Sequence, residues 1–145
     1  MIQRLAGMAA TLAPSLWAGV IMGAGFIAVP AIFDVPPVGK PVAYGAAARV
    51  FERLATAEWM FAALLALSLI ALKLPRRRTV GLVCLIALLA AQAIWLRPEL
   101  LERAAILAHG GAVEPSPAHG IYAGIELVKL AWLAGLAYAG GGMRT

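Results

Sequence analysis

The chain has 145 residues, 63% of them hydrophobic and 13% charged, and its mean hydropathy is +0.88. A soluble domain is nearer half apolar and a quarter charged, so this composition excludes an ordinary soluble protein and predicts an integral membrane protein. The net charge of +5 comes from basic residues at the ends of apolar stretches, where they orient a protein in a lipid bilayer, so we do not expect nucleic acid as a partner.

Four apolar stretches are each close to the length of about 20 residues that a membrane span needs. They leave little chain for a separate soluble domain, so residues 1–145 are expected to form a single integral membrane domain. The predicted fold is all-α, a four-helix transmembrane bundle. Its spans are expected at about 11–33, 55–72, 80–96 and 119–138.

The first stretch carries a cluster of glycines. Gly19 and Gly23 have the spacing that lets two membrane helices approach closely. This face of the first span is therefore expected to contact another chain, in a homo-oligomer or a larger membrane complex. Pro30 is expected to kink or end the helix. The apolar run from Leu12 to Phe33 is too long for a typical signal peptide, so we expect a retained span.

The segments between the spans contain prolines, glycines and charges. Asp34–Gly45 is rich in proline and is predicted to be a loop, and 46–54 to be an amphipathic helix at the outer interface. Arg97 and Pro98 are expected to end the third span. A second short interfacial helix is then predicted over 99–108, followed by a loop.

A basic turn between the second and third spans sets the predicted orientation. Lys73, Arg76, Arg77 and Arg78 place four cations within six residues, and such clusters stay on the cytoplasmic side of a membrane. Both termini are then predicted to be cytoplasmic, and the two proline-rich loops to lie on the outer side. We expect a multi-pass protein of a cell's inner membrane.

The last stretch carries two charges far from its ends, Glu126 and Lys129. With His119 and Tyr122 they follow the spacing i, i+3, i+7, i+10, which is one face of a helix. At about 1.5 Å per residue, a glutamate of the second span and a glutamine of the third fall at a similar depth. The sequence therefore predicts an intramembrane polar cluster that opens outward: Glu58, Gln92, His119, Tyr122, Glu126 and Lys129.

A charge at the bilayer centre costs about 2.5–3.5 kcal/mol on insertion scales, so Lys129 is expected between Glu58 and Glu126. One ammonium against two carboxylates leaves a formal negative charge. A proton on one carboxyl group, a bound cation, or a nearby Arg49 or Arg53 would balance it.

Two functions are consistent with this cluster. The first is a membrane protein that binds or handles a small ligand, cation or metal ion. The alternative is a structural or accessory subunit of a membrane complex, whose buried charges only lock the helix packing. The candidate ligand-binding residues for the first function are Glu58, Gln92, Tyr122, Glu126 and Lys129.

The sequence gives few signals for metal, haem or catalysis. His119 is a candidate metal ligand, with His109 and Glu114 nearby, but the chain has no pair of cysteines and no histidine pair at a recognised ligand spacing. Haem would need a second suitably placed histidine within a span. No nucleophile, phosphate-binding or dinucleotide motif occurs, so we do not predict an enzyme.

The first 55 residues or so resemble a known family. The segments LWAGVIMGAGFIAVPAIF (Leu16–Phe33) and GAAARVFERL (Gly45–Leu54) are similar to a small four-span membrane family that includes TMEM205-like and DUF4149 proteins. Pro30 and Phe33 match its Pro-x-x-Phe-like motif. The chain also resembles, more loosely, single modules of copper-resistance D-type membrane proteins. The resemblance implies a four-span fold. It implies no activity, and the polar residues of 119–138 have no counterpart in the family's pattern.

Overall fold

The computed structural model describes residues 1–35, 39–73 and 75–141, with 139–141 as backbone alone. All regular elements within these ranges are helical. In chain order they are α1 (Ile2–Ile21), the π-helical segment η1 (Met22–Ala28), α2 (Val29–Phe33), α3 (Lys40–Leu72), α4 (Arg76–Ala91), the π-helical segment η2 (Gln92–Leu96), α5 (Arg97–Ala108) and α6 (Ala118–Gly141).

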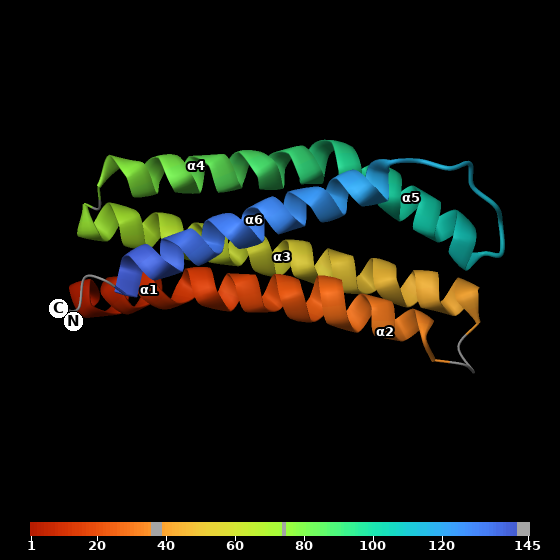
Figure 1. The fold of residues 1–145 in the computed structure, drawn as a ribbon, viewed down its shortest axis with the longest axis horizontal. Helices are drawn as coiled ribbons and strands as arrows, with labels where there is room; N and C mark the ends of the chain where they lie inside the picture. The colour runs from red at the N-terminus through yellow and green to blue at the C-terminus, as the bar shows by residue number, and fades with distance from the viewer. Residues whose placement is uncertain (36–38, 74, 142–145) are drawn as a thin grey trace.

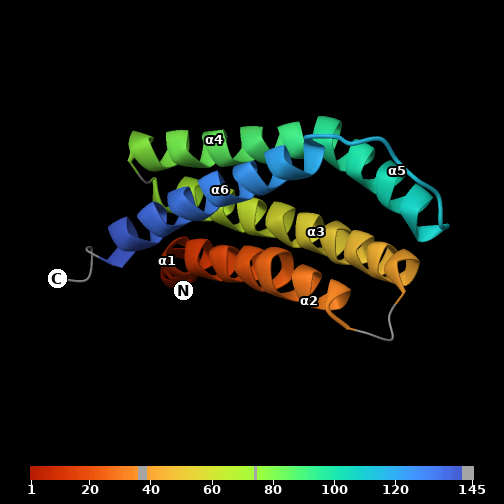
Figure 2. The same cartoon turned by 45° about the vertical axis from the view of Figure 1, so that its right-hand side comes forward.

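These elements join into four rods, each long and apolar enough to cross a membrane: Ile2–Phe33, Lys40–Leu72, Arg76–Ala108 and Ala118–Tyr138. The rods lie lengthwise beside one another in an all-α bundle (Figures 1 and 2). The start of α1, the connection between α3 and α4, and the last turns of α6 lie at one end. The connections from α2 to α3 and from α5 to α6 lie at the other end, which we call the loop end.

The outer surface of the bundle is apolar, as a lipid-facing surface must be. Ile70 and Ile94 are 75% and 80% exposed, and many other large apolar side chains also point outward. The interior is closely packed around Trp17, which stacks on Phe61 at 6.4 Å between ring centroids. The main buried cluster draws on all four rods: Trp17, Ile21, Leu54, Ala62, Leu85, Leu89 and Leu133.

The predicted loop over Asp34–Gly45 is wrong in its second half, because α3 begins at Lys40. Pro41 lies in the first turn of α3, where a backbone N–H would have no helical partner, so proline is tolerated there. Pro36 and Pro37 lie outside the described residues. The predicted amphipathic helix and the second span are one continuous helix of 33 residues. At about 1.5 Å per residue this is about 50 Å, longer than the ~30 Å hydrocarbon core.

The prediction that Arg97 and Pro98 end the third span is also wrong, because the helix continues through them to Ala108. A proline inside a helix removes one hydrogen bond and crowds the carbonyl four residues earlier. Here a π-helical segment precedes the proline and widens the backbone, and the Arg97 N–H donates to the Gln92 carbonyl. The first rod accommodates Pro30 in the same way, with the Val29 N–H donating to the Ala24 carbonyl. Pro30 therefore does not end its helix, which runs to Phe33.

Candidate functional site: a buried polar network below an apolar cavity

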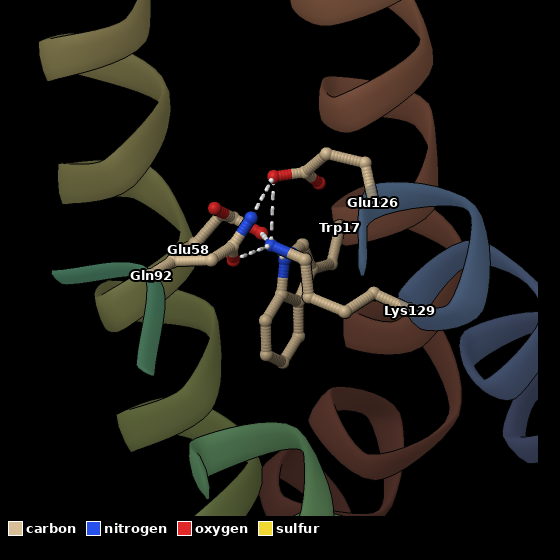
Figure 3. A network of polar contacts seen from close by, with 5 residues as sticks. All are labelled: Trp17, Glu58, Gln92, Glu126 and Lys129. Atoms are coloured by element: carbon tan, nitrogen blue, oxygen red, sulfur yellow. Dashed lines mark hydrogen bonds and ion pairs between the residues drawn. The ribbon is translucent and has the colours of Figure 1, made fainter. Parts of the chain in front are cut away.

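Five polar side chains from all four rods meet in the centre of the bundle (Figure 3). The Lys129 Nζ donates to Glu58 Oε1 at 2.5 Å, to Gln92 Oε1 at 2.8 Å and to Glu126 Oε1 at 2.9 Å. The Gln92 Nε2 donates to Glu126 Oε1 at 2.9 Å. The Trp17 Nε1 donates to Glu58 Oε1 at 3.0 Å. We call these five residues the buried network.

The buried network is closed to solvent and nearly saturated. Lys129 is 0% exposed, and none of the five side chains exceeds 4%. An ammonium group has three N–H donors, and Lys129 uses all three. Its three oxygen acceptors surround it as ligands surround a small cation. Lys129 therefore lies between Glu58 and Glu126, as the sequence predicted.

One acceptor of the buried network stays open. Within the described residues, Glu126 Oε2 is the one fully buried side-chain polar atom that has no hydrogen-bond partner. With Lys129 as the cation and Glu58 and Glu126 as carboxylates, the five side chains carry a formal charge of −1. An open acceptor and a surplus negative charge in the same place favour one further donor or cation close by.

Arg97 is the cation best placed to balance that charge. It lines a void of about 10 Å³ together with Glu58 and Gln92, a volume close to that of one water-sized sphere. Arg49 and Arg53, the arginines expected in this role, point elsewhere. Arg49 lies 3.8 Å from Glu52 in an exposed ion pair, and Arg53 is exposed.

A larger cavity of about 230 Å³ lies at the loop end, between α2, α3, α5 and the start of α6. Its wall is mostly apolar. The polar side chains in the lining are few: Arg97, Arg103, Ser116, His119 and Tyr122, together with Tyr44. Arg97 and Tyr122 line both this outer cavity and the small void beside Glu58 and Gln92. They therefore stand between the cavity and the buried network.

The loop between α5 and α6 is fastened over the cavity by polar contacts. The Arg103 side chain donates to the Glu114 carbonyl. The Ser116 hydroxyl donates to Glu99 Oε1 at 2.5 Å and accepts from the Ala118 N–H at 3.2 Å. The turn at the end of α5 uses Gly110 at φ +80°, a conformation that L side chains rarely adopt. Hydrogen bonds thus hold the loop beside the cavity in place.

The six predicted cluster residues divide into two groups. Glu58, Gln92, Glu126 and Lys129 meet in the buried network. Tyr122 is 4% exposed and packs edge-on against Phe51 at 5.5 Å, close enough to Glu126, Glu58 and Arg97 to feel their charges. The residues at the top of the predicted face, His119 and Tyr122, line the outer cavity, whereas the four network residues do not.

The prediction that the cluster opens outward is therefore corrected. The open space at the loop end stops at Arg97 and Tyr122, and the charged network lies sealed beneath them. The prediction failed because depth along a helix was calculated correctly but the side chains that fill the space between helices were not foreseen.

Two residues of the site were missed. Trp17 lies in an apolar span, and its indole N–H gave no sequence signal beyond the general rule that a buried indole finds an acceptor. Arg97 was read as the end of the third span, which placed it outside the protein interior. The proline after it was the misleading signal, since Pro98 follows a π-helical segment and does not end the helix.

His119 stands alone as a candidate metal ligand. Within the part of the chain that the structure describes, no three His, Cys, Asp or Glu side chains are grouped closely enough to hold a metal ion. His119 lines the outer cavity, and His109 is turned back so that its Nδ1 lies 2.7 Å from the Ala105 carbonyl at the end of α5. Among the described residues, the metal hypothesis therefore finds no set of three ligands.

The glycines of the first span are not used inside the molecule. A Cβ atom added at Gly19 or Gly23 would meet no atom within 4 Å, whereas one at Gly81 of α4 would meet Trp132 Nε1 at 2.8 Å. Gly81 thus marks a point of close approach between α4 and α6. The face that carries Gly19 and Gly23 is left open.

No family model, curated protein or solved structure matches the chain. The resemblance to the TMEM205-like and DUF4149 family thus stays a prediction. What the structure itself gives is an all-α bundle of four long helical rods, each apolar enough to span a membrane, with buried, paired charges.

Proposed function

We propose that this protein binds a small, mainly apolar ligand in the outer cavity, and that the buried network holds the floor of that cavity in place. The observation that carries this proposal is the cavity itself, an apolar space of about 230 Å³ with a few convergent polar groups. An apolar cavity of about 150 Å³ is enough to admit benzene. The space at the loop end therefore suits one ring or a short branched chain.

The buried network supports this function by fixing the helices below the cavity relative to one another. Lys129 ties α6 to α3 and, through Gln92, to the third rod, and Trp17 ties α1 to the same carboxylate. Tyr122 and Arg97 stand directly above this locked layer. Ligand binding needs such a preorganised floor, because ordering side chains on binding costs affinity.

Orientation and location follow from the charges. The start of α4, with its basic residues, and the start of α1 lie at the same end of the bundle, and the residues that line the cavity belong to the loop end. We therefore propose that both termini face the cytoplasm, and that the cavity opens toward the outer side of a cell's inner membrane. We also propose that the chain is related to the four-span family that includes TMEM205-like and DUF4149 proteins.

A cavity-filling variant tests the proposed function. Ala104 lines the cavity, whereas Ala105 is exposed on the same helix, so Ala104→Phe should abolish binding and Ala105→Phe should not. The probes are ring-sized molecules, benzyl alcohol, benzamide and benzoate, added to purified protein in detergent micelles. Binding is measured by calorimetry and by the rise in unfolding temperature. Equal binding by both variants would place the probes in the detergent or elsewhere on the protein, and the proposal would be wrong.

One observation favours the alternative, a structural or accessory subunit. Gly19 and Gly23 leave room for another helix against α1, and small residues at this spacing let two backbones approach closely. We propose self-association through this face as the second candidate function. Gly19→Leu with Gly23→Leu should reduce crosslinked dimer in membranes without changing monomer stability. Unchanged crosslinking would remove this candidate.

A further inference from the structure

We propose that the ligand of the outer cavity is an acid, with an apolar body about the size of one ring and a carboxylate that binds Arg97. This inference rests on the proposed function and names the chemical class of its ligand. It begins from the charges of the lining. Arg97, Arg103 and His119 contribute basic groups, and none of the lining residues is acidic.

Arg97 and Arg103 are not equivalent. Arg103 is occupied, because its guanidinium donates to the Glu114 carbonyl and fixes the loop over the cavity. Arg97 is half-buried at the first turn of α5, and within the described chain no carboxylate lies within ion-pair distance of it. Its five N–H donors form the planar fork that fits a carboxylate. Arg97, which lines both the cavity and the void beside Glu58 and Gln92, is therefore the inner cation that a bound anion would satisfy.

The position of Arg97 explains why the anion would bind at the inner end of the cavity. Glu58 and Gln92 line the small void on the other side of Arg97, so the guanidinium already stands in the field of the buried network, with its formal charge of −1. That field keeps an arginine cation stable at this depth. It also makes the network a poor second site for an anion, so a carboxylate is confined to the cavity side of Arg97.

The rest of the cavity supplies the apolar contacts. Val29 and Phe33 of α2, Phe51 of α3, and Leu100 and Leu107 of α5 line it. A hydrocarbon body has no polar group that would need a partner in this part of the cavity. A second charged group on the ligand would find no partner there.

The experiment compares three probes of one shape, benzoate, benzamide and benzylamine, on the wild-type protein and on Arg97→Gln. We expect benzoate to bind wild type about tenfold more tightly than benzamide, which corresponds to about 1.4 kcal/mol, and benzylamine to bind least. Arg97→Gln should abolish the preference for benzoate while keeping benzamide binding. Arg53→Gln, an exposed arginine of α3, is the matched control and should keep the preference.

The outcomes separate the two proposals. If benzamide binds wild type as well as benzoate does, or if Arg97→Gln keeps the preference, the acidic head is wrong and the proposed ligand site stands. If none of the three probes binds, both proposals fail. If Arg97→Gln unfolds, which far-UV circular dichroism and gel filtration would show, Arg97→Lys takes its place. Lysine keeps the charge without the planar fork, so a reduced preference for benzoate is expected, and an unchanged or increased one would overturn the role of the guanidinium.

Discussion

Lys129 and Glu58 lie 71 positions apart in the sequence, yet the lysine Nζ and the glutamate Oε1 are 2.5 Å apart in the centre of the bundle. Both side chains are almost completely buried. A charge pair in such a place contributes little when it is intact, because both charges had to leave water, but losing one partner leaves the other charge unpaired. Replacing one of these two residues should therefore cost more stability than the intact pair contributes.

Removing the ammonium should be severely destabilising. Lys129→Met leaves Glu58 and Glu126 buried together without a cation, and we expect a loss of about 3–5 kcal/mol in the free energy of unfolding. The measurement is unfolding in mixed micelles of detergent and denaturing surfactant. Lys40→Met, at an exposed position at the start of α3, is the control and should change stability little. Equal losses in the two variants would contradict the buried network.

Removing all three charges together should restore much of that stability. In a variant that combines Lys129→Met with Glu58→Gln and Glu126→Gln, no buried charge is left unpaired, and such replacements are often neutral. We expect the triple variant to be at least 2 kcal/mol more stable than Lys129→Met alone, an order-of-magnitude value from the same comparison. A triple variant as unstable as the single one would mean that the lysine contributes packing and not charge.

The indole of Trp17 should be needed for more than its volume. Trp17→Phe keeps an aromatic ring in the core but removes one of the two donors to Glu58 Oε1, which still accepts from Lys129. A hydrogen bond to a charged group contributes about 1.5–3 kcal/mol. Trp95→Phe, at a residue that is 60% exposed, should cost much less. The two variants are compared by the same unfolding measurement, and a similar cost for both would rule out the hydrogen bond as a source of stability.

Replacing Gly81 with a larger residue should lower the free energy of unfolding. A Cβ atom there would meet Trp132 Nε1 at 2.8 Å. Gly81→Ala should therefore lower the free energy of unfolding by about 1 kcal/mol. This is at the low end for an overpacked site, because Trp132 is 43% exposed and can turn outward. Gly135→Ala, with open space around it, is the control. Adding Trp132→Leu should remove the cost of Gly81→Ala, and a cost that persists would point to the backbone and not to the ring.

Orientation can be tested with single cysteines. In a Cys84→Ser background, Arg77→Cys lies at the basic end and Ser116→Cys in the loop between α5 and α6. A thiol reagent that does not cross membranes should label the Ser116→Cys variant in intact cells, and the Arg77→Cys variant only after the membrane is opened. The reverse pattern would invert the proposed topology.

The sequence was sufficient to predict four long apolar helices, the ends of the bundle at which the loops lie, and the common level at which four network residues meet. Hydropathy predicts these helices because crossing the hydrocarbon core takes about 20 consecutive apolar residues, although the first three rods run longer than that. Depth follows from the fixed rise of a helix, so Glu58, Gln92 and Glu126 could be placed near Lys129 before any contact was known.

The rotation of each helix about its axis could not be predicted. Most faces of these rods are apolar, so composition does not show which face turns inward, and the role of Trp17 stayed hidden. The effect of the prolines could not be predicted for a different reason. Their cost depends on what the backbone before them does, and the first turn of α3 and the π-helical segments before Pro30 and Pro98 all remove it. The outer cavity could not be predicted, because its lining depends both on the rotation of the helices and on whether the helices continue through the prolines.

The two π-helical segments also limit how this chain can vary in length. A π turn holds roughly one residue more than the α turn it replaces, so deleting one residue within Met22–Ala28 or Gln92–Leu96 would restore a regular helix. Every residue beyond the deletion would then keep its face of the helix, because the restored α turn covers the same rotation with one residue fewer. Val29 and Phe33, or Leu100 and Leu107, would still face the cavity, whereas a deletion in a regular α-helical part of the same rods would rotate the residues beyond it by about 100°. The π-helical segments are thus the places where these rods can lose one residue without changing the cavity lining.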